Sequence, residues 1–305
     1  MAQRIAYVNG QFLPEDQASI SIFDRGLRWG DGVYDVERTF HHIPFELEAH
    51  MERLYRTLRY VRIRPPVSRI EMQRLVEELA RRNSPCFEPE EDFELCQIVT
   101  RGTIQEPERP NVVMYCQELD WASHAEVYEH GVRLITASTR RVPPQCLSPN
   151  AKVGNKMHLM IAAEEARAAD ARALALVLDL EGKVAESSSH NFFFVAGGVL
   201  RTPSLANCLP GISRAVTMRL AREEGIPCEE GSYTVFDVYN GEEAFLTSTG
   251  PCIVPVSHLD GIRLGTSVPG PVTKRLMEAW NRLAGLDIVS QAQKMARTRG
   301  RLVVS

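Results

Sequence analysis

The spacing of apolar residues along the chain predicts several helices. In ELEAHMERLYRTLRYVRI, residues 46–63, large apolar side chains recur at steps of four, three, four and three, which is one stripe of a 3.6-residue period. SRIEMQRLVEELARR, residues 68–82, opens with Ser68 and Glu71 in a capping-box arrangement and predicts a second helix. Further helices are predicted at residues 157–169, 212–225 and 270–285.

Stretches rich in apolar and β-branched residues predict strands between these helices. They are IAYVNGQFLP, GVYDVERTF, FELCQIVTRG and NVVMYCQ before residue 120, and GVRLITAS, ALALVLDL, NFFFVAGGVLRT and EEAFLTS after residue 131. The final AQKMARTRGRLVVS predicts a partly ordered tail. The sequence therefore predicts a mixed α/β fold class with a smaller N-terminal α/β domain over 1–120, an interdomain connection over 121–131 and a larger C-terminal domain over 132–305.

Composition and charge argue against several partners. The 305 residues include 35 basic and 39 acidic side chains, for a formal charge of −4, and no basic block favours a nucleic acid or an anionic membrane. The seven cysteines show neither a C-x-x-C pair nor a Cys/His spacing suited to zinc, so we expect no metal and a reducing compartment. The N-terminus lacks the apolar core of a signal peptide, and the cytoplasm is the expected location.

Two lysines stand out in LSPNAKVGNKMHLMIAAEEA, because Lys152 and Lys156 precede a predicted Ala-rich helix. The positive end of a helix dipole disfavours an ammonium and lowers the pKa of a nearby lysine, and a neutral amine is a nucleophile. The alternative is that both are solvated surface lysines. About 30 residues later, VAESSSHN places Glu186 before small hydroxyl residues, where it faces either a site or simply the edge of a strand.

Other segments are suited to an anion. LPGISRAV places Ile212 and Ser213 at a predicted helix N-terminus, where free N–H groups favour a phosphate. FLTSTGPCIVPV ends a strand with Ser248 and Thr249, and Arg53 in HMERL has the planar guanidinium that suits phosphate. Each has a plainer explanation, for example Ser213 as an N-cap. Together they suggest one phosphorylated cofactor.

These segments resemble, in order, the class IV aminotransferases, the fold-type IV pyridoxal-phosphate enzymes that include branched-chain and D-amino-acid transaminases and aminodeoxychorismate lyase. The matching pieces are FDRGLRWGDGVYDV, HMERL, AKVGN, VAESSSHN, LPGISR, TSTGPCIVPV and PGPVTKRL. The resemblance implies two α/β domains with pyridoxal 5'-phosphate between them, a homodimer, and exchange of an amino group between an amino acid and a 2-oxo acid by a ping-pong mechanism.

The resemblance also implies roles for individual residues. Lys152 matches the Schiff-base lysine, while Lys156 falls where the family has an apolar or aromatic residue. Glu186 matches the carboxylate that pairs with the pyridine nitrogen, and Tyr34 matches an aromatic residue on the substrate side. The remaining matches are to the phosphate cradle, with one contributor near the ring face: Arg53, Ile212, Ser213, Ser248 and Thr249, and Ser189.

The substrate is not implied. Beyond the T-R-G turn, the carboxylate-binding Arg and His of the D-amino-acid enzymes are replaced by Gln105, Glu106 and their neighbours, and VYDVERTF replaces a FEGIR-like stretch of the branched-chain enzymes. Candidate carboxylate partners are Arg28, Arg101, Arg140 and Arg141. Alternatives are a lyase that expels pyruvate, an amine transaminase, and a non-catalytic homologue.

Overall fold

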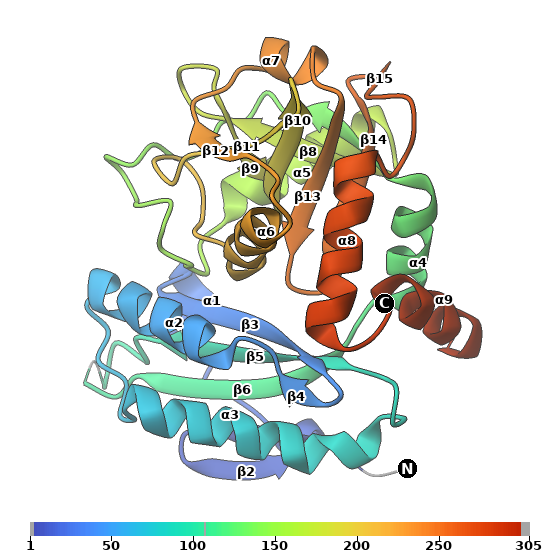
Figure 1. Cartoon of the computed structure of the whole chain (residues 1–305). Helices are drawn as coiled ribbons and strands as arrows, with labels where there is room; N and C mark the ends of the chain where they lie inside the picture. The colour runs from blue at the N-terminus through green and yellow to red at the C-terminus, as the bar shows by residue number, and fades with distance from the viewer. Residues whose placement is uncertain (1–2, 107, 300–305) are drawn as a thin grey trace. The chain divides into compact units, whose positions relative to one another are not determined.

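The computed structural model describes residues 3–106 and 108–299, and these divide into two compact units (Figure 1). One unit takes the chain up to Leu119 together with Ala151–Lys156, and the other takes Asp120–Asn150 and the chain from Met157 onward. The mixed α/β class is confirmed. Among the described residues, none of the helices has both the length and the apolar character that crossing a membrane requires.

The N-terminal unit is built on an antiparallel sheet with the strand order β2-β1-β6-β5-β3-β4. Helices α2 (Leu47–Val61) and α3 (Arg69–Asn83) pack on one face of it. The other elements are β1 (Ile5–Val8), β2 (Gln11–Pro14), η1 (Glu15–Gln17), α1 (Arg25–Trp29), β3 (Gly32–Phe40), β4 (Ile43–Pro44), η2 (Ser84–Cys86), β5 (Phe93–Thr100) and β6 (Asn111–Glu118).

The predicted stripe of α2 is the face that packs against the sheet. Met51, Leu54 and Leu58 are fully buried there with Val33 of β3. Because side chains alternate along a strand, Asp35 and Glu37 share the helix-covered face with Val33, whereas Tyr34 lies on the opposite face. This alternation determines which side chains of β3 meet α2.

The C-terminal unit contains a larger mixed sheet with the order β12-β11-β10-β13-β14-β7-β8-β9, and β15 pairs with β14. Stacked phenylalanines of adjacent strands, Phe193 and Phe245, lie fully buried in it. Its strands are β7 (Val132–Thr136), β8 (Ala173–Leu178), β9 (Val184–Ser187), β10 (Asn191–Ala196), β11 (Val199–Pro203), β12 (Cys228–Gly231), β13 (Glu243–Ser248), β14 (Cys252–Leu259) and β15 (Ile262–Arg263). Its helices are α4 (Trp121–His130), α5 (Met157–Ala169), α6 (Ile212–Glu223), α7 (Val235–Tyr239), α8 (Pro271–Ala284) and α9 (Ile288–Arg299).

Two segments differ from the sequence-based expectation. The residues assigned to a connection form α4, which Asp120 caps by accepting a hydrogen bond from the Ser123 N–H at 3.1 Å. The first part of the expected partly ordered tail, residues 292–299, belongs to α9, which buries Ile288, Ala292 and Met295. Residues 300–305 of that tail lie outside the described residues.

The fold generates a prediction at Asp24, a fully buried carboxylate that caps α1. It accepts hydrogen bonds from the Gly26 N–H at 2.7 Å, the Thr100 hydroxyl at 2.6 Å and the Asn111 amide at 2.5 Å. Asp24→Ala leaves buried donors without an acceptor, so we expect the free energy of unfolding in urea to fall by about 2–4 kcal/mol.

The matched control is Asp120→Ala, which removes the exposed cap of α4 and should cost about 1 kcal/mol or less. Equal losses in the two variants would contradict the argument from burial.

Candidate active site

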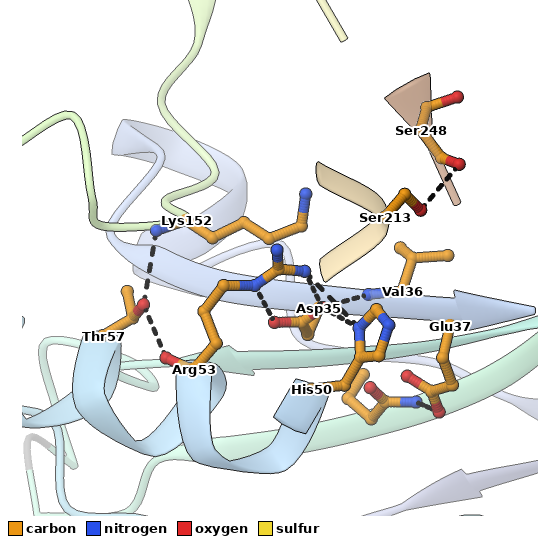
Figure 2. Close-up of polar contacts among 10 residues, drawn as sticks. Asp35, Val36, Glu37, His50, Arg53, Thr57, Lys152, Ser213 and Ser248 are labelled. Carbon is orange, nitrogen blue, oxygen red and sulfur yellow. Dashed lines mark hydrogen bonds and ion pairs between the residues drawn. The ribbon is translucent and has the colours of Figure 1, made fainter. Parts of the chain in front are cut away.

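Lys152 lies in the segment Ala151–Lys156, which docks along β3. The Tyr34 N–H donates to the Lys152 carbonyl at 3.1 Å and the Gly154 N–H donates to the Gly32 carbonyl at 2.9 Å. The Lys152 N–H donates to the Thr57 hydroxyl of α2 at 3.3 Å (Figure 2). Lys152 Nζ then lies 4.5 Å from the centroid of the Tyr34 ring. Because α5 begins at Met157, Lys156 borders the helix and Lys152 does not.

Arg53 is buried on α2 and is held by Asp35 of β3 (Figure 2). Its Nε donates to Asp35 Oδ2 at 2.9 Å and its Nη2 donates to Oδ1 at 2.6 Å, which is a bidentate ion pair. His50 Nδ1 lies 2.8 Å from the same Oδ1. The pair fixes the plane of the guanidinium, so Arg53 is oriented in advance for any anion that it binds.

Burial and neighbouring charges together determine the protonation states of Asp35 and His50. Burial alone would raise the pKa of Asp35, but the Arg53 charge and the hydrogen bond from His50 outweigh it and lower the pKa. Burial lowers the pKa of His50, although Asp35 opposes the shift. We therefore assign an ionised Asp35 and a neutral His50 that donates its Nδ1–H to the carboxylate.

Glu37 is a second carboxyl on the same face of β3. Burial, together with the nearby Asp35 charge, raises the pKa of Glu37 well above its ordinary value. Its Oε1 lies 2.7 Å from the Gln97 amide nitrogen of β5. Asp35, Glu37 and His50 could be considered metal ligands, since their ligand atoms lie within 4.8 Å of one another. Both oxygens of Asp35 already meet Arg53, however, and the cluster is better described as an ion pair beside a neutral acid.

Glu186 is the centre of a second cluster, in the C-terminal unit. It is buried on β9, and Arg141 Nε lies 2.9 Å from its Oε1 in an ion pair. Its Oε2 accepts hydrogen bonds from the Leu209 N–H at 3.0 Å and the Asn191 amide at 3.4 Å. Arg141 Nη1 also lies 2.7 Å from His158 Nε2 of α5. These donors hold the carboxylate in a fixed orientation.

The N-terminus of α6 offers backbone donors to an anion. Gly211 is the N-cap, and the first turn at Ile212 receives no side-chain cap. A Cβ at Gly211 would lie 1.9 Å from Asn191 Oδ1, so the site requires glycine. The Ser213 hydroxyl donates to the Ser248 carbonyl at 2.9 Å, which joins this turn to the end of β13 (Figure 2). Thr249 directly follows β13.

The structure places the other candidate residues in different settings. Ser189 is exposed, and its hydroxyl lies 2.9 Å from Nδ1 of the adjacent His190. Of the candidate carboxylate partners, Arg101 is paired with Asp31 and also donates to carbonyls at the end of α2. Arg140 donates to the Ala137 carbonyl, and Arg28 lies over the Trp29 ring. These contacts give Arg28, Arg101, Arg140 and Arg141 local structural partners.

Sequence reasoning did not single out Asp35, Glu37 or His50. The period-two pattern of β3 carries a signal for them, since it puts Asp35 and Glu37 on the side of Val33 that a helix must cover. Their partners could not be identified from spacing, because the pairing depends on how α2 is rotated against the sheet.

The chain is similar to known aminotransferases over most of its length. The model of the amino-transferase class IV family matches residues 32–259. A Methanocaldococcus jannaschii protein, provisionally named a branched-chain-amino-acid aminotransferase, is 35% identical over 277 residues, covering 89% of this chain and 93% of that protein. A Bacillus licheniformis D-alanine aminotransferase is 30% identical over 278 residues, covering 89% and 94%. The structure of the T.th. branched-chain amino acid aminotransferase with pyridoxamine 5'-phosphate has a TM-score of 0.85 and 29% identity, covering 93% and 95%.

The neutral acid at Glu37 gives a pH-dependence prediction. A carboxyl whose folded-state pKa is raised contributes stability that is fully present below its unfolded pKa, about 4.3, and that is lost as pH rises through the folded pKa. Glu37→Gln removes this titration. We expect the variant to gain stability relative to the parent as pH rises above about 4, by up to about 1.4 kcal/mol per pH unit, in urea unfolding across a pH series.

Asp35→Asn is the control with the opposite sign. In the parent, the pKa of Asp35 is lowered in the folded state, so Asp35 contributes stability above its unfolded-state pKa, and this stability is lost as pH falls. The variant also leaves Arg53 buried without its counter-charge. We expect a loss on the order of 3–5 kcal/mol at neutral pH. Parallel pH curves for the parent and Glu37→Gln would show that Glu37 does not carry the buried proton.

Proposed function

Because the chain belongs to the class IV aminotransferase family and is an enzyme of that class, we propose that it moves an amino group between an amino acid and a 2-oxo acid with pyridoxal 5'-phosphate as cofactor. The observation that carries the proposal is the docking of Lys152 onto β3, which fixes one amine beside Tyr34 in a family whose chemistry requires a lysine.

The residues present fit this cofactor. Arg53 is a preoriented guanidinium and the uncapped first turn of α6 presents the N–H groups of Ile212 and Ser213, so both suit a phosphate. Gly211 leaves room for the Asn191 amide beside this turn, since a Cβ there would strike Asn191 Oδ1. We assign Ser248 and Thr249 to the phosphate site at the N-terminus of α6, because the Ser213 hydroxyl bonds to the Ser248 carbonyl.

Glu186 is proposed to pair with the protonated ring nitrogen. The Leu209 N–H and Asn191 amide hold Oε2, and Arg141 holds Oε1, so the carboxylate cannot rotate freely. Its negative charge favours a proton on a nitrogen that it contacts. Ser189 is proposed as a contributor near the ring face. It is exposed, and its hydroxyl contacts His190 Nδ1.

When bound, pyridoxal phosphate supplies an aldehyde that forms a Schiff base with an amine and a ring that accepts electrons from the substrate α-carbon. Lys152 Nζ is the amine that we assign to it. With the cofactor bound, Lys152 Nζ would take the proton from the substrate α-carbon and later give it back, acting first as base and then as acid. Tyr34 lines the substrate side. A second 2-oxo acid reverses these steps, which makes the kinetics ping-pong.

The amino donor belongs to the branched-chain or D-amino-acid class, because the similar proteins carry both kinds of name. We also propose a homodimer. Large apolar side chains gather on the exposed segment before β3, with Ile22, Phe23, Leu27 and Trp29 each at least half exposed. Such a patch favours a second copy of the chain. The seven cysteines are all free thiols, which supports a reducing, cytoplasmic setting.

The first test is the absorbance spectrum of the purified protein with D-alanine, L-glutamate or L-leucine. We expect a visible Schiff-base band that converts to a near-ultraviolet form with one of these donors. Lys152→Ala should lose the band and reduce turnover on the order of 10⁴-fold. Lys156→Ala should keep the band.

Two results would overturn the assignment. A band that survives in Lys152→Ala and disappears in Lys156→Ala would exchange the two lysines. Release of pyruvate from aminodeoxychorismate without an acceptor would replace the transaminase with a lyase.

The homodimer is tested by light scattering of Leu27→Glu, which puts a charge on a side chain that is 65% exposed. We expect the dimer to dissociate, because an interface core excludes an unpaired charge. Ile70→Glu is the control, since Ile70 is 61% exposed but lies on α3. A parent protein that is monomeric at high concentration would refute the dimer.

A further inference from the structure

Lys156, the last residue of segment Ala151–Lys156, is a partly buried lysine that contacts Tyr34. Its Nζ lies 3.3 Å from the Tyr34 hydroxyl and donates a hydrogen bond to it. The same Nζ is 5.8 Å from the centroid of the Tyr34 ring. Both residues are partly buried, so this contact is shielded from solvent more than a surface contact.

The backbone fixes this arrangement. Segment Ala151–Lys156 is bonded to β3 at Gly32 and Tyr34, and Val153 bridges to Val33. Lys152 and Lys156 stand at its two ends, and both ammonium groups approach the same tyrosine ring. The Tyr34 ring is therefore close to both the proposed cofactor lysine and a second lysine.

The charge balance around Tyr34 favours its ionisation. Burial alone would raise the pKa of Tyr34, but the charges of Lys152 and Lys156, with their hydrogen bonds, outweigh burial and lower it. The acidic groups on the same face of the neighbouring strands behave differently. Burial raises the pKa of Glu94 on β5 and that of Cys96 to about 12, and it also raises the pKa of Tyr115 on β6.

Other charged groups near the lysines are already compensated. On the helix-covered face, Arg53 is paired with the carboxylate of Asp35, and burial keeps His50 neutral. Glu94 accepts a hydrogen bond from Gln117 at 2.6 Å. Lys152 also acts to lower the pKa of Glu94 and of Cys96, but burial outweighs it there, whereas at Tyr34 the two lysine charges outweigh burial.

We propose that Lys156 is a positioning residue that holds the Tyr34 hydroxyl as the acceptor of a proton from Lys152 Nζ. In this step one N–H bond of the Lys152 ammonium breaks and one O–H bond forms on the Tyr34 phenolate, leaving a neutral amine and a neutral phenol. The reverse step returns the proton. The role assigned to Lys152 rests on the proposed function, whereas the coupling of Lys156 to Tyr34 requires only this chain.

The coupling is measured on the full-length chain without added cofactor, by NMR of ring-labelled tyrosine across a pH series. Tyr34→Phe identifies the Tyr34 signal. We expect Lys156→Met to shift the Tyr34 titration to higher pH, because it removes one of the two neighbouring charges, and Lys156→Arg to move it back. Arg59→Met, which removes an exposed charge of α2, is the matched control and should not shift it.

A second readout uses the holoenzyme. If Tyr34 takes the proton from Lys152, the acidic limb of the pH profile of kcat shifts to higher pH in Lys156→Met and returns in Lys156→Arg. A purely structural role would lower activity without moving that limb.

The outcomes separate this inference from the proposed function. An unshifted Tyr34 titration in Lys156→Met, in a protein that shows the Schiff-base band and transaminates, overturns the inference alone. A shifted titration in a protein without band or turnover supports the coupling and overturns the proposed function. An unshifted pH profile alongside a shifted titration overturns the proton transfer between Lys152 and Tyr34.

Discussion

The backbone docking of segment Ala151–Lys156 onto β3 is the constraint on which the N-terminal cluster depends. Two hydrogen bonds, at Gly32 and at Tyr34, set the register between strand and segment. Strand alternation then sends Tyr34 to the face where the lysines lie and Asp35 to the face that α2 covers, where it meets Arg53. One register thus decides which amine approaches the tyrosine and which carboxylate orients the arginine. Backbone bonds of this kind do not depend on the identities of the side chains that they place.

The clusters around Asp35 and Glu186 both bury a carboxylate, and both pair it with an arginine. Each contains a buried carboxylate with an arginine, Asp35 with Arg53 and Glu186 with Arg141. Such pairs add little net stability, because desolvation offsets the attraction, but an unpaired charge in the same place is costly. Their value is orientation. Glu37 adds a third carboxyl to one cluster and remains neutral, so the burial of a second negative charge beside Asp35 is avoided.

Much of the fold could be read from the sequence, because periodicity reports burial. The stripe of α2 was predicted residue by residue: Leu47, Met51, Leu54 and Leu58 are buried, and Val61 is partly buried. Helix α4 was not predicted, since only Trp121 and Tyr128 of it are buried, too few to show a period. Helix α9 was not predicted, because its buried Ile288, Ala292 and Met295 are separated by polar residues. For the candidate site, the resemblance predicted roles for Lys152, Glu186 and Arg53, and these roles stay predictions. The contacts of His50 and Arg141 could not be predicted, because they arise only when distant segments pack.

Segment Ala151–Lys156 belongs by its contacts to the N-terminal unit, although the residues on both sides of it in sequence belong to the other unit. The segment must therefore join a unit whose other residues are all made before it. The whole six-stranded sheet described for the first unit leaves the ribosome before Ala151 does. Domains generally fold as units during synthesis, so the sheet and its helices form a platform first. Lys152, the proposed cofactor lysine, is then added as a late, non-local contact, after part of the second unit has already been made.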